Sequence, residues 1–379
     1  MDIFWFHESF TLRLFFNRII FGTDCLFLLK SATNNSLNCK TLEEKVTLKE
    51  LARILGVSIA TVSKALNDNY DISEETKERI RAKAKEMNYV PNVIAQSLKL
   101  KRTFNLGVII PNITDYFFAR ALRGITKEAK ENKFKVVISI SNEELQNEVD
   151  SVNLLLNSRV DGILMSLSSE TQLLEQYSHL NKIIQSEIPL VLFDRVSNAV
   201  KCDKVTIDDY KSAYDATFFL IRKGCRNIAF LSSIYKTSVC ALRKQGYSQA
   251  LADSKLNIGK PVFVDVLPDD TVEERISEFL ESNKIDAILA AEEHSAVASL
   301  HVVQNLGYKV PQDISVIGFT NGAFNKYTIP ALTSINQHSE TMGRTATKLL
   351  VNRLKKGKEK SDFEHVIIQT DLMERKSTK

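Results

Sequence analysis

The chain has 379 residues, which is more than one ordinary hydrophobic core uses and predicts two or three folding units. With 44% hydrophobic and 25% charged residues, the composition excludes a disordered or fibrous protein. The formal net charge of +4 is too small to indicate a nucleic-acid partner by itself. Evidence for such a partner has to come from how the charged residues are distributed along the chain. Five scattered cysteines form no C-x-x-C pair and favour a reducing compartment, so we expect a cytoplasmic protein.

Residues 1–41 differ in character from the rest of the chain. They contain the only tryptophan, Trp5, and seven of the twenty phenylalanines. The apolar run Phe10–Leu29 has the length of a membrane span, but it contains charges such as Arg13 and Arg18, each costing about 2.5–3.5 kcal/mol at a helix centre. No uninterrupted apolar segment leads into a signal-peptide cleavage site. We interpret the segment as a misplaced translation start, with a membrane anchor as the alternative.

Helical spacing dominates the next segment. Apolar residues from Leu48 to Leu55 predict a first helix, and Gly56 ends it. Ser58 is a good N-cap for a second helix over Ile59–Leu66. A third helix is predicted from Ser73 to Pro91, because proline disfavours helix in the residue before it.

Two short helices joined by a glycine-containing turn are what a helix-turn-helix uses to place its second helix in the major groove. The hydroxyl groups suited to phosphate contacts are those of Ser58, Thr61 and Ser63. The side chains suited to thymine methyls, guanine or a phosphate are Ile59, Ala60 and Lys64. An ordinary helical hairpin is the alternative interpretation.

Positive charge is concentrated between Lys77 and Arg102, where eight basic residues stand against two acidic ones. Those up to Lys85 fit a solvated helix face. The later ones flank the short apolar stretch Val93–Leu98, which favours a DNA contact.

From Asn105 onward, short apolar runs alternate with helical stretches. The runs are Leu106–Ile110, Val136–Ile140, Gly162–Ser166, Leu190–Phe193, Ile228–Leu231, Ala287–Ala290 and Val316–Phe319. Strands this apolar, separated by amphipathic helices, predict parallel sheets covered on both faces. The length fits two such sheets, so the predicted fold class is α/β, preceded by a small all-α domain.

These motifs resemble one known family. The segments Val46–Asn67, Ile72–Lys77 and Asn88–Leu98 resemble the LacI family of bacterial regulators. Further matching segments are Leu106–Pro111, Asp161–Leu164, Phe193–Arg195, Gly246–Tyr247, Val316–Phe319 and Leu332–Ile335. The resemblance covers roughly residues 42–375, and the helix-turn-helix with its hinge is the most specific part.

The resemblance implies a domain organisation. Residues 42–90 would form the DNA-binding domain, 91–103 a hinge helix and linker, and 104–375 a periplasmic-binding-protein-like effector and dimerisation domain. Its two Rossmann-like subdomains would be 104–207 with 336–360, and 208–335. Leu98 matches the hinge leucine that wedges between base pairs in the minor groove. The expected DNA-binding residues are Thr47, Ser58, Ile59, Ala60, Thr61, Ser63, Lys64, Asn67, Asn92, Leu98 and Lys99.

An effector site is expected at the carboxyl ends of the parallel strands. The candidate residues are Phe117, Phe118, Asp194, Arg243, Glu292, Glu293 and Thr320. Asp194 and Arg243 suit sugar hydroxyls, and the two phenylalanines suit stacking on a ring. Relatives often carry Asn-Asp at Glu292–Glu293 and Asp at Thr320, so the chain departs from the family's pattern at these positions.

The expected function is a ligand-responsive transcription regulator, a repressor, that binds palindromic double-stranded operator DNA. We expect a sugar or related metabolite as effector, a homodimer, no cofactor or metal, and no membrane partner. A solute-binding protein is the runner-up, but it has no use for a helix-turn-helix. A sugar-modifying enzyme is the third possibility, although the sequence contains no catalytic motif and its six histidines form no cluster.

Overall fold

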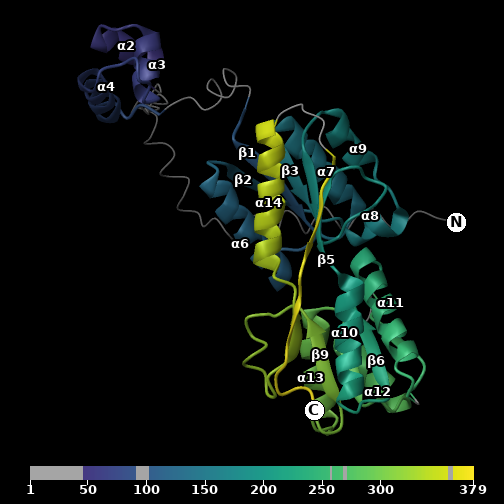
Figure 1. The fold of residues 1–379 in the computed structure, drawn as a ribbon. Coiled ribbons are helices and arrows are strands. Elements are labelled where there is room, and N and C mark those ends of the chain that lie inside the picture. The colour runs from purple at the N-terminus through teal and green to yellow at the C-terminus, as the bar shows by residue number, and fades with distance from the viewer. Residues whose placement is uncertain (1–45, 91–101, 257, 268–270, 357–361) are drawn as a thin grey trace, which may run out of the picture. The chain divides into compact units, whose positions relative to one another are not determined.

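A computed structural model of the chain describes residues 46–90, 102–256, 258–267, 271–356 and 362–379 (Figure 1). The chain divides into two compact units between Asn92 and Val93. The predicted extension at 1–41 lies outside the described residues, as does most of the predicted hinge with Asn92, Leu98 and Lys99.

The first unit is a three-helix domain, as the sequence predicts. Its helices are α2 (Leu48–Leu55), α3 (Ile59–Leu66) and α4 (Glu74–Glu86). Their buried faces form one small core of Leu51, Ala52, Val62, Ala65, Ile80 and Ala84. Gly56 ends α2 in the left-handed conformation, with φ 65°. Helix α4 ends earlier than predicted, because Asn88 adopts φ 50° before Pro91 is reached.

The second unit has two lobes, each built on a six-stranded sheet. The N-lobe strands are β1 (Asn105–Ile110), β2 (Lys135–Ile140), β3 (Gly162–Met165), β4 (Leu190–Phe193), β5 (Asp203–Ile207) and β11 (His365–Ile368). They lie in the order β11-β5-β4-β3-β1-β2, and every pair is parallel.

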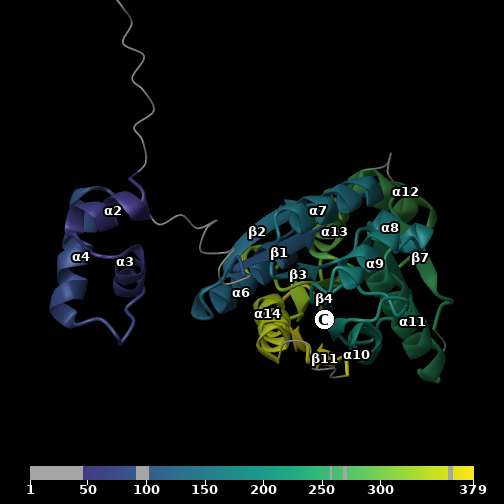
Figure 2. The ribbon, with the colours of Figure 1, turned by 90° about the horizontal axis from the view of Figure 1, so that it is seen from above.

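Helices cover both faces of the N-lobe sheet. These helices are α6 (Tyr116–Glu131), α7 (Leu145–Asn157), α8 (Ser169–Leu174), α9 (Ser178–Gln185) and α14 (Ser339–Lys356). Val108 and Ile110 pack with α6 and α14, whereas Ile109 packs with α7 and α9 on the opposite face. Helices α6 and α14 lie side by side (Figures 1 and 2). This double covering explains why the central strands are apolar at every position.

The C-lobe repeats this design. Its strands are β6 (Ile228–Ser232), β7 (Val262–Asp265), β8 (Ala287–Ala290), β9 (Ser315–Phe319), β10 (Thr333–Asn336) and β12 (Asp371–Met373). Their order is β12-β10-β9-β8-β6-β7, and only β12 runs antiparallel to its neighbour. Its helices are α10 (Asp209–Arg222), α11 (Ser238–Asp253), α12 (Val272–Ser282) and α13 (Glu293–Asn305). The predicted α/β class with two parallel-dominated sheets is confirmed.

The chain passes between the lobes three times, after β5, after β10 and after β11 (Figure 1). Side chains tie these crossing segments together. His338 Nε2 lies 2.6 Å from Asp371 Oδ2, and Ser212 Oγ lies 2.9 Å from Thr370 Oγ1. The crossings bring the carboxyl ends of strands from both sheets into one region, where a ligand is expected in folds of this kind.

Candidate nucleic-acid interface and ligand site

The amino end of α3 is open to solvent. Ser58 caps it, because its Oγ accepts a hydrogen bond of 3.0 Å from the backbone N–H of Thr61. Ile59 is 47% exposed and Ala60 is exposed beside it. Val62 and Ala65 on the other side are fully buried. The predicted contact residues therefore lie on the accessible face of α3.

Other predicted DNA-binding residues are engaged in local structure. Thr47 caps α2 by accepting from the backbone N–H of Glu50, at 3.2 Å. Asn67 Nδ2 donates to the carbonyl oxygen of Ser63, at 2.8 Å. Both side chains also face solvent, so capping does not preclude a DNA contact.

Lys64 has a partner that sequence reasoning missed. Its ammonium lies 2.8 Å from Asp71 Oδ2, and both side chains are partly exposed. The hydrogen bond from Lys64 holds the pKa of Asp71 below its usual value. The α4 charges are paired as well: Lys77 binds Asp68 and Glu74. Arg81 pairs with Asp68 and Lys83 pairs with Glu86, so three of the five basic residues at 77–85 have acidic partners within the unit.

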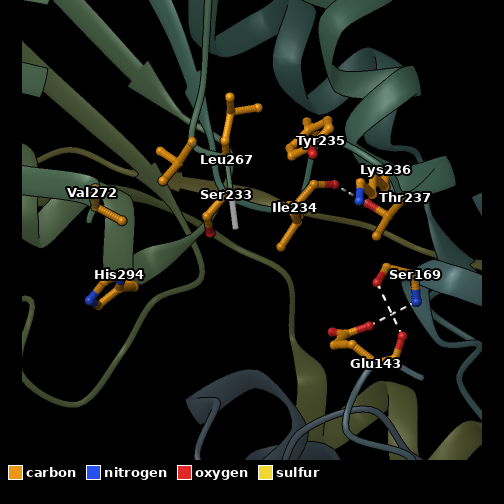
Figure 3. Close-up of a pocket in the computed structure, with 11 residues that line it drawn as sticks. Glu143, Ser169, Ser233, Ile234, Tyr235, Lys236, Thr237, Leu267, Val272 and His294 are labelled. Carbon is orange, nitrogen blue, oxygen red and sulfur yellow. Dashed lines mark hydrogen bonds between the residues drawn. The ribbon is translucent and has the colours of Figure 1, made fainter. Parts of the chain in front are cut away.

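A cavity of about 380 Å³ opens in the second unit and has walls from both lobes (Figure 3). Glu143 and Ser169 belong to the N-lobe wall. The C-lobe contributes the segment Ser233–Thr237 after β6, His294 on α13, and the apolar residues Val266, Leu267 and Val272. Glu143 accepts a hydrogen bond of 2.8 Å from the backbone N–H of Ser169.

Arg243 on α11 lies in a buried ion pair. Its Nε donates to Asp209 Oδ1 at 2.7 Å, and its Nη1 donates to the carbonyl oxygen of Ala291. The guanidinium carbon lies 3.9 Å from the centre of the Phe319 ring. Burial raises the pKa of Asp209, and Arg243 opposes that shift. The predicted pocket arginine is thus held in place by its own chain.

A second ion pair, between the buried Arg195 and the partly exposed Glu143, was not among the predicted site residues. Arg195 Nη1 donates to both carboxylate oxygens of Glu143, at 2.7 and 2.6 Å. Its Nε is buried and has no hydrogen-bond partner in the described part of the chain. The sequence offered one signal, since Arg195 directly follows the predicted Asp194 at the end of β4.

Asp194 is only 7% exposed, and none of the hydrogen bonds found among the described residues ends on its carboxylate. The nearest guanidinium nitrogen, Arg195 Nε, lies 3.9 Å from Asp194 Oδ2, which is too long for a hydrogen bond. Burial raises the pKa of Asp194 to about 7, although Arg195 opposes the shift. This carboxyl group is available for a ligand.

The two glutamates at the end of β8 are enclosed in different ways. Glu292 Oε1 accepts from Ser233 Oγ at 2.9 Å and from Ser295 Oγ, whereas its buried Oε2 has no partner among the described residues. The Glu293 carboxylate lies directly over Gly322. Burial raises the pKa of both glutamates to about 7.

The remaining predicted residues lie close to this region with other neighbours. Phe117 and Phe118 are buried in the core and meet edge to face at 5.2 Å. Their stacking on a ligand ring stays a prediction. Thr320 adopts φ 73° and its Oγ1 donates to Gln337 Oε1 at 2.7 Å. It therefore links the end of β9 to a segment that crosses between the lobes.

The three carboxyl groups with a pKa near 7 predict a pH-dependent stability. An unfolded carboxyl group has a pKa of about 4, so the folded state binds these protons more tightly. Their contribution to stability is fully present below about pH 4 and is lost as the pH rises through about 7. We expect the unfolding temperature of the second unit to fall between about pH 5.5 and 8, and Asp194→Asn to reduce that fall. A scanning-calorimetry series showing no fall would contradict it.

Two further observations concern the described residues alone. None of their helices combines the length and the hydropathy needed to cross a membrane. No three of their histidine, cysteine, aspartate or glutamate side chains are arranged to hold a metal ion.

Comparisons with known proteins agree with this architecture. The family model described as "Bacterial regulatory proteins, lacI family" matches residues 47–92, and "Periplasmic binding protein-like domain" matches residues 218–378. Catabolite control protein A of Priestia megaterium is 32% identical, over 88% of this chain and 99% of its own. The HTH-type transcriptional repressor PurR of Vibrio campbellii (strain ATCC BAA-1116) is 30% identical, over 88% and 98%.

Solved structures give the same result. The transcriptional regulator CelR–cellobiose complex matches with a TM-score of 0.64 and 25% identity, over 88% of this chain and 99% of that one. The Lac repressor dimer bound to operator and the anti-inducer ONPF matches in fold, with a TM-score of 0.78 and 23% identity over the same shares. The chain therefore belongs to the LacI family of bacterial transcription regulators, which bind DNA and are not enzymes.

Proposed function

We propose that this chain is a repressor that binds palindromic operator DNA as a homodimer in the cytoplasm, and that a sugar or related metabolite controls its affinity for DNA. Residues 42–90 bind the major groove, 91–103 form the hinge, and 104–375 bind the effector and the second subunit. The proposal rests on one observation, the presence of two structural features in the same chain. A helix-turn-helix with an open recognition face precedes two lobes whose strand ends hold buried polar atoms that have no partner among the described residues.

Helix α3 reads the operator in this proposal. Its exposed amino end brings Ile59 and Ala60 to base edges, and hydroxyl groups near the cap contact phosphates. Two copies of α3 facing two half-sites would make the operator a palindrome. Leu98 would wedge into the minor groove at its centre, where unstacking a base step costs a few kcal/mol and permits a bend.

The effector acts from the strand ends. It binds between the lobes near Asp194, Arg243 and Glu292, and changes their relative orientation. Thr320 supports this coupling, because it joins the site to the crossing segment at Gln337. Effector and operator then alter each other's affinity by one factor, since linkage is reciprocal.

Selection of bound duplexes from a random pool tests the proposal. We expect enrichment of one palindromic sequence whose affinity falls steeply with salt, because phosphate contacts release counterions. A pool that stays random after repeated rounds would refute DNA recognition by this chain.

Asp71→Asn is expected to tighten operator binding several-fold. The substitution removes a negative charge beside the recognition helix and frees Lys64, which the carboxylate holds at 2.8 Å. A freed lysine that reaches a phosphate should also increase the salt dependence by about one counterion. Fluorescence anisotropy at several salt concentrations measures both effects.

Glu78→Gln is the matched control, because it removes the same charge from an exposed position of α4 in the same unit. It should change the affinity less than Asp71→Asn does. Equal effects of the two substitutions would mean that only net charge matters, and that the Lys64–Asp71 pair has no specific role.

A surface segment of the C-lobe supports the homodimer. Between β9 and β10, three large apolar side chains face solvent: Phe324 at 75%, Tyr327 at 68% and Ile329 at 84% exposed. Gln304 Nε2 on α13 holds this segment through the carbonyl oxygen of Ile329, at 2.9 Å. Large apolar side chains exposed so close together in the sequence are typical of a protein interface.

Ile329→Glu is expected to convert the dimer into a monomer, because it places a charge within the apolar patch. Sedimentation velocity should show the mass fall by half at micromolar concentration. Leu154→Glu on α7, also exposed, is the control and should leave the mass unchanged. A dimer that survives Ile329→Glu would place the interface elsewhere.

A further inference from the structure

The strand ends between the lobes hold more carboxyl groups than basic groups. The carboxyl groups in this region are those of Asp115, Glu143, Asp194, Asp209, Glu292 and Glu293. The guanidinium groups are those of Arg195 and Arg243. These groups interact electrostatically across the two lobes. The negative charges of Asp115 in the N-lobe and of Asp209 in the C-lobe both raise the pKa of Asp194. A further cation on the cavity wall, Lys236, has its ammonium 5.5 Å from the centre of the Tyr235 ring.

Both guanidinium groups are already neutralised by carboxylates of the chain. Arg243 pairs with Asp209 at 2.7 Å, and Arg195 pairs with Glu143 at 2.6 Å. The four carboxyl groups that remain are Asp115, Asp194, Glu292 and Glu293. Asp115 accepts one hydrogen bond, from the backbone N–H of Phe117, and has no cation within pairing distance among the described residues.

Two of these groups have oxygens that lack a donor. Asp194 is almost wholly buried and accepts no hydrogen bond within the described chain, and Glu292 Oε2 is buried without a partner. Arg243 is among the charged groups that lower the pKa of both carboxyl groups. Neither carboxyl group lines the cavity itself, but each lies behind its wall: Ser233 on the wall bonds to Glu292, and Glu143 on the wall bonds to Arg195, which follows Asp194. The cavity, at about 380 Å³, has room for a molecule of sugar size.

A neutral polyol would supply hydrogen bonds to these oxygens but no charge. When a neutral ligand displaces water, an ionised carboxylate without a counterion is desolvated, which costs free energy. Its pKa then rises and the carboxylate takes up a proton. An anionic ligand would add repulsion. A protonated amine supplies both donors and the missing charge, and a charge-assisted hydrogen bond is about twice as strong as a neutral one.

We propose that the effector carries a positively charged amino group on a hydroxylated, sugar-sized skeleton, with the ammonium between Asp194 and Glu292. This inference rests on the proposed function, because it assigns a ligand class to that effector site. The hydroxyl groups of the ligand face the serines at the end of β6 and the remaining carboxylates.

Proton linkage gives the inference a distinctive signature. Burial holds the pKa of Asp194 and Glu292 at about 7 in the free protein. An ammonium between them stabilises the ionised form and lowers both pKa values, so binding at pH 7 releases protons. A neutral sugar brings hydrogen bonds but no charge, so it releases fewer protons or takes protons up.

Isothermal titration calorimetry of the full chain, in two buffers with different ionisation heats, measures affinity and proton release together. The probes are matched pairs: glucosamine with glucose, galactosamine with galactose, and mannosamine with mannose. We expect at least one amino sugar to bind at least tenfold more tightly than its neutral partner and to release protons. Neutral sugars binding equally or better in every pair, or no binding by any of the six, would overturn the inference.

Asp194→Asn and Glu292→Gln should each reduce the preference for the amine, and Glu281→Gln, exposed at the end of α12, should leave it unchanged. Removing a buried unpaired charge should not unfold the protein, and the second variant covers the case in which the first misfolds. Duplex selection is a separate experiment, so loss of the amine preference with intact DNA selection rejects only the ligand class. Failure of duplex selection rejects the regulator itself.

Discussion

Arg243→Met is expected to destabilise the second unit by about 3–5 kcal/mol, because it leaves the buried Asp209 carboxylate without its counterion. Methionine retains much of the side-chain volume and can keep contact with the Phe319 ring. The loss therefore reports the charge pair and its hydrogen bonds rather than a cavity. Urea unfolding of the full chain, followed by circular dichroism, measures it.

The double variant Arg243→Met with Asp209→Asn isolates the cause. Removing both charges abolishes the unpaired carboxylate, so the double variant should recover much of the lost stability. Both variants should retain duplex binding with a diminished response to ligand, since α3 belongs to the separate first unit. An Arg243→Met protein as stable as the natural chain would show that the pair does not hold the lobe together.

Gly343→Ala is expected to destabilise the N-lobe by about 1–3 kcal/mol, although alanine ordinarily favours a helix over glycine by roughly 0.5–1 kcal/mol. Gly343 lies in α14 where that helix meets α6, and an added Cβ would overlap the carbonyl oxygen of Ala121. Gly124 on α6 meets the carbonyl oxygen of Glu340 in the same way. Backbone contact leaves no flexible side chain to move aside, so the helices must separate.

Ala119→Gly on the exposed side of α6 is the control for that experiment. It should cost only the helix propensity, about 0.5–1 kcal/mol. Urea unfolding compares the two. A Gly343→Ala protein more stable than the natural chain would mean that α6 and α14 can accommodate the added Cβ without separating.

The sequence predicts the fold well wherever one physical signal dominates. All three helices of the first unit follow from their caps and periodicity, and the central strands follow from their continuous apolar runs. Five strands were not predicted from the sequence: β5, β7, β10, β11 and β12. All five contain polar residues, and β11 alternates between exposed and partly buried positions. Runs of three to five such residues carry no clear period.

The candidate sites divide in a similar way. Strand ends could be located from sequence, so Asp194 and Glu292 were found, whereas Arg243 on α11 was identified from the family resemblance. The partners that determine their chemistry could not, because Asp209 is 34 residues from Arg243, and Glu143 is 52 residues from Arg195. The ion pair between Lys64 and Asp71 could not be predicted either, because nothing in the sequence of α3 indicates that Asp71, beyond the following loop, lies close to Lys64. Ion pairing depends on tertiary contacts, which composition and local spacing do not contain.

Ligand-dependent operator binding is the property on which the proposed function depends most directly. Fluorescence anisotropy with the selected palindrome and random competitor, at moderate ionic strength, should give a specific complex whose Kd changes at least fivefold with one sugar-type metabolite. The calorimetric affinity for that metabolite should change by the same factor when the palindrome is present. A chain that binds palindrome and competitor equally, with or without metabolites, would contradict the account.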